Sequence, residues 1–237
     1  MIKLSIIIPV FNEEQTIDRL LHKVVEARLP KNINKEIIVV DDGSEDNSKF
    51  KIQNSKFKTM KKVFHEKNLG KGAAIKSGLK VATGDYIIIQ DADLEYDPVY
   101  YTKLLEPVIK ENASVVYGTR LKNYPLRFWG KHKTVLPSHL IANRFLSLLT
   151  NLLYGAKLTD METGYKLFKR EILQKISLES KRFEFEPEIT TKILRLKIPI
   201  VEIPIKVTPR SYKEGKKIGW LDGIMALWTL IKYRVID

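Results

Sequence analysis

Short apolar runs alternate with helically spaced apolar residues along the first half of the chain. Nearly continuous runs at residues 3–10 and 36–40 predict buried strands, and apolar positions three and four residues apart at 13–28 predict a helix between them. The alternation continues to residue 117, with further strands and helices predicted at 62–65, 73–82, 86–89, 98–110 and 114–117. This order favours an α/β fold, in which helices cover a mostly parallel sheet.

The second half of the chain loses this regularity. Residues 121–137 are basic and aromatic and predict a mobile loop. Beyond the loop, apolar stripes at helical spacing run from Ile141 to Leu153 and from Trp220 to Ile231, and the pattern between them predicts a helix at 187–196 and a strand at 200–207. We expect all 237 residues to form a single domain.

The charge of the chain narrows the choice of partner. Its 41 Lys and Arg against 28 Asp and Glu give a net charge of +13, which is typical of proteins that bind nucleic acid, anionic membranes or phosphorylated compounds. The chain has no RNP signature and no Cys/His finger, so we expect no nucleic acid partner. Without cysteine it has no disulfide framework, and without a signal-peptide pattern we expect a cytoplasmic protein.

Acidic residues follow the predicted strand at 86–89 directly. Asp91, Asp93 and Glu95 come within six residues of its end. Ligands of open α/β sheets bind beyond the carboxyl ends of the strands, and carboxylates are preferred ligands of Mg²⁺ and Mn²⁺, which bridge them to phosphates. The pattern therefore predicts metal-assisted phosphate chemistry, although a solvated acidic turn would have the same composition.

Five short motifs resemble, in order and spacing, the family 2 glycosyltransferases of GT-A fold. They are residues 6–14 (IIIPVFNEE), 39–44 (VVDDGS), 68–72 (NLGKG), 91–93 (DAD) and 118–120 (GTR). Residues 160–166 (DMETGYK) and 212–218 (YKEGKKI) narrow the resemblance to the branch of dolichyl-phosphate mannose synthase and related polyprenyl-phosphate sugar transferases.

The resemblance implies a Rossmann-like GT-A domain with a C-terminal amphipathic helix. Residues 1–120 would form the nucleotide-sugar and metal half, and residues 121–237 the acceptor half, with the loop at 121–137 closing over the donor. The two apolar stripes would either pack in the core or lie against an anionic membrane surface. Many relatives of this branch carry C-terminal membrane spans, whereas we expect none in this chain because it has no apolar stretch of about 18 residues.

The resemblance also implies roles for particular residues. Those expected to hold the nucleotide sugar are Pro9, Phe11, Glu13, Asp41, Asp42, Lys71 and Asp91. Asp91, Asp93 and Glu95 would hold Mg²⁺ or Mn²⁺, although the branch often has Gln where this chain has Glu95. The residues expected to hold the acceptor phosphate are Arg120, Arg144, Arg210, Lys216 and Lys217. Asp91, Asp93 and Arg120 are the expected catalytic residues.

The expected reaction is an inverting, metal-dependent transfer of a hexose, mannose or glucose, from a GDP- or UDP-sugar to a polyprenyl or dolichyl phosphate. A lipid phosphate is already ionised and needs no general base, which suits the absence of a Gln-x-x-Arg-Trp motif. If a base is needed, Asp160 or Glu162 would serve. The enzyme would be peripheral, at the inner face of the membrane.

Two other functions remain open from the sequence. A family 2 transferase acting on a sugar or polysaccharide hydroxyl would share the donor motifs and would be active without lipid phosphate. A nucleotide-sugar-binding protein at the membrane surface, without catalysis, would bind the donor but not turn it over. Fold alone does not separate these functions, because each is decided by its site.

Overall fold

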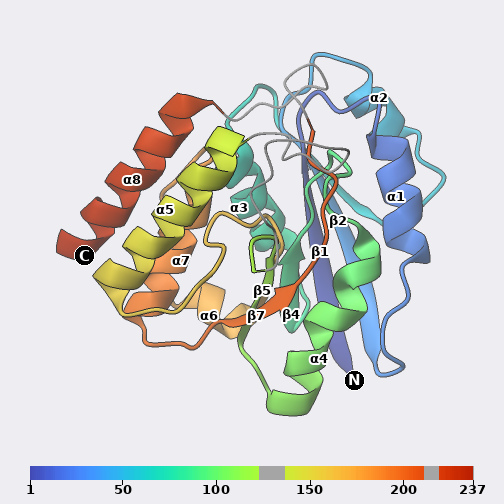
Figure 1. The fold of residues 1–237 in the computed structure, drawn as a ribbon. Helices are drawn as coiled ribbons and strands as arrows, with labels where there is room; N and C mark the ends of the chain where they lie inside the picture. Colours follow the sequence, from blue (N-terminus) through green and yellow to red (C-terminus); the bar gives the residue numbers. More distant parts are fainter. Residues whose placement is uncertain (123–136, 211–218, 237) are drawn as a thin grey trace, which may run out of the picture.

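A seven-stranded sheet forms the centre of the molecule in the computed structural model, which describes residues 1–122, 137–210 and 219–236 (Figure 1). The strand order is β3-β2-β1-β4-β6-β5-β7, and every neighbouring pair is parallel except those that include β6. The strands are β1 Ile2–Val10, β2 Ile33–Asp41, β3 Lys61–Phe64, β4 Tyr86–Ile89, β5 Val115–Thr119, β6 Lys166–Lys169 and β7 Val201–Pro204. The predicted α/β fold with a mostly parallel sheet is therefore confirmed.

Helices cover both faces of this sheet. They are α1 Ile17–Glu26, α2 Ser48–Gln53, α3 Lys71–Val81, α4 Tyr101–Glu111, α5 Pro137–Tyr154, α6 Arg170–Gln174, α7 Phe185–Arg195 and α8 Trp220–Val235, and a short 3₁₀ turn at Pro98–Tyr100 precedes α4. Alternate side chains of β1 point to opposite faces. Leu4, Ile6 and Ile8 join the cluster under α1 and α4, whereas Ile7 joins the cluster under α3 and α7.

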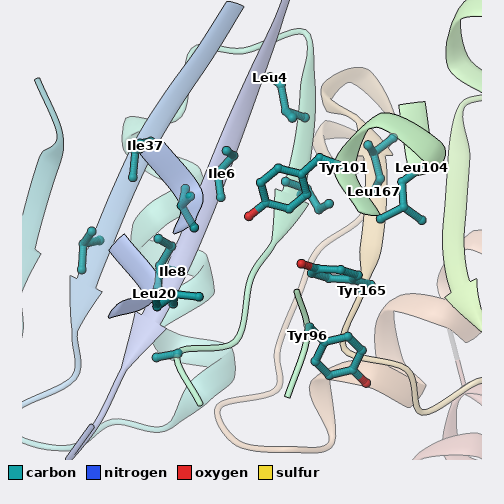
Figure 2. Close-up of a cluster of buried hydrophobic side chains, with 14 of the residues drawn as sticks. Leu4, Ile6, Ile8, Leu20, Ile37, Tyr96, Tyr101, Leu104, Tyr165 and Leu167 are labelled. Carbon is teal, nitrogen blue, oxygen red and sulfur yellow. The ribbon is translucent and has the colours of Figure 1, made fainter. Parts of the chain in front are cut away.

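Figure 2 shows the first of these clusters, in which Leu20 of α1 lies beside Ile6 and Ile8 of β1. The same cluster includes a column of three buried rings, Tyr101, Tyr165 and Tyr96, in that order. The ring of Tyr165 lies 4.8 Å from that of Tyr96 and 6.0 Å from that of Tyr101, measured between centroids. The core therefore reaches up to the acidic segment that follows β4.

The helices α5 and α8 form a separate layer outside α7 (Figure 1). Leu146, Ala226 and Leu230 are buried between them. Other apolar residues of the two helices are exposed: they are Ile141, Phe145, Leu148 and Leu152 of α5 and Trp220, Leu221, Ile224, Met225, Trp228, Ile231 and Val235 of α8. Each predicted stripe thus has a packed side and an exposed side. None of the helices in the described ranges has the length and hydropathy that a membrane span requires.

Two elements differ from the sequence-based expectation. The sequence Lys166–Lys169 forms β6, the antiparallel strand between β4 and β5, and α6 follows it at once. Neither was predicted, because two apolar residues between two lysines are too short a run to give a periodic signal. The predicted loop at 121–137 lies, for residues 123–136, outside the described part of the chain, and its last residue, Pro137, begins α5.

Glu36 on β2 links β1, β3 and the segment before β4. Its carboxylate on β2 accepts hydrogen bonds from Ser5 at 2.6 Å, from the Thr83 backbone at 2.8 Å and from Lys3 at 3.0 Å, and it pairs with Lys61 at 2.8 Å. Burial alone would raise the pKa of Glu36, but these donors outweigh it and hold the pKa well below the ordinary value of 4.5.

We expect Glu36→Gln to destabilise the protein by about 2 kcal/mol at neutral pH. The substitution removes the negative charge to which Lys3, Ser5, Lys61 and Thr83 are bound. A carboxylate whose pKa is lowered by folding stabilises the protein above its unfolded-state pKa and loses this contribution as the pH falls. The difference between wild type and E36Q, measured by urea unfolding, should therefore shrink below pH 4.5. The exposed Glu111→Gln is the control; a difference independent of pH would contradict the assignment.

Candidate active site

A cavity of about 780 Å³ opens at the carboxyl ends of the parallel strands. The end of β1 and the segments after β2, β4 and β5 all reach its wall, so Pro9, Asp42, Asp91 and Arg120 meet there although they are far apart in the chain. From this edge the cavity extends between α5 and α8, where Phe145, Leu146, Trp220, Ile224 and Leu227 line it. It is therefore polar and charged at the sheet and apolar at the outer helices.

Asp42 organises the loop that begins α3. Its carboxylate accepts hydrogen bonds from the backbone of Leu69 at 3.0 Å and of Gly70 at 2.7 Å, and His65 Nδ1 lies 2.6 Å from it. Gly70 has a φ of +98°, and a side chain there would also strike the Lys181 carbonyl. Asp42 lines the cavity, whereas Asp41 is fully buried behind it. One carboxylate oxygen of Asp41 has no hydrogen-bond partner among the described residues.

Lys71 lies between two carboxylates at the start of α3. Its ammonium group is 2.8 Å from Asp91 and 2.8 Å from Glu186, the second residue of α7. Burial opposes the charged form, but Asp91 and Glu186 outweigh it and raise the pKa of Lys71. The lysine is therefore a fixed cation in the cavity wall, next to the first of the expected metal ligands.

The three acidic residues after β4 do not converge on one point. Within the described ranges, no group of three His, Asp or Glu side chains is arranged to enclose a metal ion. Glu95 accepts a hydrogen bond from the Arg210 backbone at 2.9 Å, and Asp93 accepts one from the Glu95 backbone at 3.0 Å. Burial, together with the neighbouring charges of Asp91 and Glu95, raises the pKa of Asp93 to about 7.

This arrangement fits a metal that a substrate helps to bind. Mg²⁺ in phosphate-binding sites is commonly held by one or two carboxylates, by water and by the phosphates themselves, without a full protein cage. Asp91 and Asp93 both line the cavity, and Asp93 is buried close to the charges of Asp91 and Glu95, which together with burial raise its pKa. The two residues could therefore hold a divalent cation once a diphosphate is present.

Arg120 is held rigidly after β5. Its guanidinium donates two hydrogen bonds to Asp160, both at 2.7 Å, and its backbone N–H donates a third at 2.8 Å. Asp160 is fully buried, and its own segment is fixed by Glu202, which accepts hydrogen bonds from the Thr159 and Asp160 backbones. Arg120 lines the cavity and its carboxylate partner does not, so the positive charge is presented to a ligand with a fixed orientation.

Arg210 and Glu13 both line the cavity and form a further charged pair, at 3.1 Å. The backbone N–H of Arg210 is bound to Glu95, so this pair joins the segment after β1 to the segment after β4. The remaining expected phosphate ligands are placed differently. Arg144 lies on α5 and does not line the cavity, and Lys216 and Lys217 lie outside the described residues.

The comparisons with known proteins agree with this arrangement. A family model described as glycosyl transferase family 2 matches residues 5–177. The chain belongs to glycosyl transferase family 2. It is therefore a glycosyltransferase, and the resemblance read from its motifs is confirmed.

Two relatives place the chain within the family. It is 30% identical to the UDP-N-acetylglucosamine–dolichyl-phosphate N-acetylglucosaminyltransferase of Methanococcus voltae, over 97% of this chain and 95% of the relative. It is 29% identical to the dolichol-phosphate mannosyltransferase of Pyrococcus furiosus, over 92% of this chain but 60% of that protein. Both relatives belong to the branch that the motifs at 160–166 and 212–218 resemble.

A solved structure shares the fold. The glucosyl-3-phosphoglycerate synthase of Mycobacterium tuberculosis, in complex with Mn²⁺, UDP and glucosyl-3-phosphoglycerate, aligns with a TM-score of 0.73 and 20% identity, over 100% of this chain and 81% of that one. At this identity the likeness concerns the fold alone. The GT-A architecture is therefore shown both by the observed sheet and by this neighbour.

Several cavity residues were not predicted from the sequence. Glu186 lies on α7, in a run of apolar and acidic residues that belongs to none of the seven sequence motifs, and only its pairing with Lys71 reveals it. Tyr96 follows the acidic motif and is uncharged, so the motif did not point to it. Its hydroxyl accepts a hydrogen bond from the Gly164 backbone at 2.7 Å. Glu162 was considered only as a possible base, and it lines the cavity.

Gln90 fixes the position of the acidic segment from below. Its buried amide donates to the carbonyls of Asp91 and Tyr96, at 3.0 and 3.1 Å, and accepts from the hydroxyls of Tyr101 and Tyr165, at 2.7 and 2.6 Å. Gln90, Tyr96, Tyr101 and Tyr165 are all buried. The amide therefore connects β4, the acidic turn, α4 and the segment before β6.

We expect Gln90→Leu to lower the free energy of unfolding by about 3 kcal/mol or more, because it leaves two hydroxyls and two carbonyls buried without partners. Tyr101→Phe, which removes a single donor, should cost about 1 kcal/mol and is the matched comparison. Urea unfolding of the three proteins measures both effects. A Gln90→Leu variant as stable as Tyr101→Phe would show that the amide does not hold the turn.

Proposed function

We propose that the protein transfers a hexose from a GDP- or UDP-sugar to a polyprenyl or dolichyl phosphate, with inversion and with the aid of Mg²⁺ or Mn²⁺. One observation carries the proposal: a single cavity joins a cluster of acidic and basic side chains at the sheet to an apolar passage between α5 and α8. A nucleotide-sugar donor and the phosphate head of the acceptor need the charged part of such a cavity. The apolar tail of the acceptor needs the apolar part. The residues before 121 would hold the donor, and those after it the acceptor.

The donor would occupy the edge formed by β1, β2 and β4. Pro9, Phe11 and Glu13 line the cavity there beside Asp42, and carboxylates are suitable acceptors for ribose hydroxyls and base N–H groups. Asp91 and Asp93 would hold the metal ion, which neutralises diphosphate charge when bound. Lys71 adds a fixed positive charge at the same place.

The acceptor phosphate would lie against Arg120. In the transfer, a phosphate oxygen forms a bond to the anomeric carbon while the bond from that carbon to the diphosphate oxygen breaks, and the two oxygens lie on opposite sides of the sugar. The leaving pair of electrons stays on the diphosphate, and no proton has to move because the attacking phosphate is already ionised. Arg120 would position the nucleophile, and Lys71 would stabilise the leaving group.

The two candidate general bases, Asp160 and Glu162, differ in their surroundings. Asp160 is buried and occupied by Arg120, so it is unsuited to take a proton from a substrate. Glu162 lines the cavity, and burial together with the carboxylate of Glu186 raises its pKa to about 7, although Lys166 and Arg120 act in the opposite direction. This is the observation that favours the second candidate function, a transferase acting on a hydroxyl acceptor, for which Glu162 would be the base.

The exposed apolar faces of α5 and α8 would rest on the membrane. They lie on the outer layer of the molecule, at the end of the cavity's apolar passage (Figure 1). Tryptophan and leucine at such a face, with a positively charged protein behind them, are typical of helices that lie in the interface of an anionic membrane. The protein would then be peripheral at the cytoplasmic face and meet its lipid there.

The relatives support the same acceptor and leave the sugar open. One is named for transfer of N-acetylglucosamine to dolichyl phosphate and the other for transfer of mannose to dolichol phosphate. The structural neighbour was crystallised with Mn²⁺ and UDP, and a further structure of it with Mg²⁺ and UDP. We infer by similarity that a divalent cation and a nucleotide sugar are used.

The proposal is tested by incubating the protein with MgCl₂ or MnCl₂, a short polyprenyl phosphate and radiolabelled GDP- and UDP-sugars, and extracting the product into organic solvent. We expect label in the organic phase for at least one donor. Asp91→Ala with Asp93→Ala should reduce this label by about 1,000-fold or more, because the diphosphate loses its cation site. Glu106→Gln, on the exposed side of α4, is the control.

Retained transfer by the double variant would contradict the metal assignment. Transfer to a soluble sugar in the absence of lipid phosphate would establish the hydroxyl-acceptor function instead. Nucleotide-sugar binding without turnover of any acceptor would establish the non-catalytic function.

Membrane contact is tested by co-sedimentation with vesicles that contain anionic lipid. Leu148→Glu combined with Trp228→Glu should reduce binding at least about tenfold, because it places two charges on the apolar face. Both side chains are more than half exposed, at 67% and 57%, so the fold should tolerate the change. Phe50→Glu, on α2 at the other side of the molecule, is the matched control; equal loss in that variant would contradict a specific face.

A further inference from the structure

The segment 160–164 connects the two anion sites of the cavity. At one end, Asp160 holds Arg120 through both of its carboxylate oxygens. At the other end, Gly164 lies so close to Asp91 that a side chain added there would come within 2.3 Å of the Asp91 carboxylate. The Gly164 backbone is also bound to the Tyr96 hydroxyl at 2.7 Å. The middle of this segment therefore has a fixed position between Arg120 and Asp91.

Glu162 occupies that middle position and lines the cavity. Its Oε1 is buried and has no hydrogen-bond partner among the residues that the structure describes. Lys166 is nearby, but its ammonium group donates instead to the carbonyls of Met161, at 2.9 Å, and of Thr163. Arg120 is likewise committed to Asp160. A buried acceptor without a donor is costly, and so it calls for an explanation.

The geometry of the reaction indicates what lies beside Glu162. In a displacement with inversion, the sugar is placed between the attacking oxygen and the leaving oxygen. With the acceptor phosphate at Arg120 and the diphosphate at Asp91 and Lys71, the hexose has to lie between these groups. Glu162 is at that point of the wall, and the only hydrogen-bond donors that a hexose offers in quantity are its hydroxyls.

We infer that the carboxylate of Glu162 accepts a hydrogen bond from a hydroxyl of the hexose being transferred, and that it thereby selects the sugar. This inference rests on the proposed function and deepens it, because it assigns a specificity-determining residue to the donor. A site built to bind a hydroxyl rejects an analogue that lacks it far more strongly than an apolar pocket rejects a change of size. Glu162 would therefore discriminate among hexoses by the position of one hydroxyl.

The test compares binding of nucleotide sugars with binding of the nucleotide alone, by calorimetry in MgCl₂. The probes are UDP- and GDP-linked glucose, mannose and N-acetylglucosamine, together with UDP and GDP. For the sugar bound best by wild type, E162A should bind about tenfold or more weakly, whereas its affinity for the nucleotide should be unchanged. E162Q keeps the shape and one acceptor oxygen, so its affinity for the nucleotide sugar should lie between those of wild type and E162A. E106Q should bind the nucleotide sugar as wild type does.

Deoxy analogues of the same donor identify the contact. The loss caused by E162Q should disappear for the one monodeoxy sugar whose missing hydroxyl faces Glu162, and persist for the others. Unchanged nucleotide affinity in each variant reports an intact fold, so a structural defect would be recognised by equal losses for the sugar and the nucleotide. That result would overturn the inference.

Two further outcomes would overturn it and are distinguishable. Nucleotide-sugar affinities within twofold of wild type in both variants would show that Glu162 does not contact the hexose. A fall in kcat with unchanged donor affinity, and loss of a pH dependence near neutrality, would make Glu162 a base for a hydroxyl acceptor. Absence of labelled lipid with wild type would refute the proposed acceptor alone, since the binding comparison does not depend on it.

Discussion

The buried amide of Gln90 is the constraint on which the active edge of this protein depends. Four hydrogen bonds from one side chain fix the end of β4, the acidic turn after it, α4 and the segment leading into β6. Because β6 is antiparallel and lies between β4 and β5, the same amide also orients the chain between Asp160 and Gly164. The two parts of the cavity that we propose for the donor and the acceptor are thus connected through one side chain in the core.

Around that point, the charges of the cavity are held in pairs. Lys71 is shared between Asp91 and Glu186, Arg120 is bound to Asp160, and Arg210 to Glu13. Such pairs cost desolvation and contribute little to stability, but they hold each charge in one orientation before substrate arrives. Among the described residues, neither Asp93 nor Glu162 is in such a pair, and burial near other carboxylates raises the pKa of each to about 7. A bound cation or a ligand hydroxyl would therefore stabilise the charged form of these two carboxylates.

Much of this arrangement follows from the sequence, and the remainder does not for physical reasons. Apolar runs that end within three residues of Asp41, Asp91 or Arg120 identify strand ends, and parallel strands bring such ends to one edge. The pattern does not reveal β6, which is too short, or Glu186, whose importance lies in a contact with a residue 115 positions away. It also leaves unresolved which side of an apolar helix is packed. In α5 and α8 the packed and exposed sides are both apolar, so periodicity predicts the helices without predicting their exposed faces.

The central claim is that an ionised phosphate, positioned by Arg120, attacks the sugar without a general base. It is tested most directly by offering the enzyme a polyprenyl phosphate and the corresponding polyprenol, equal in chain and differing only in the phosphate. The account predicts labelled product from the phosphate and none from the alcohol. Transfer to the alcohol at a similar rate, dependent on a group that titrates near neutrality, would contradict it.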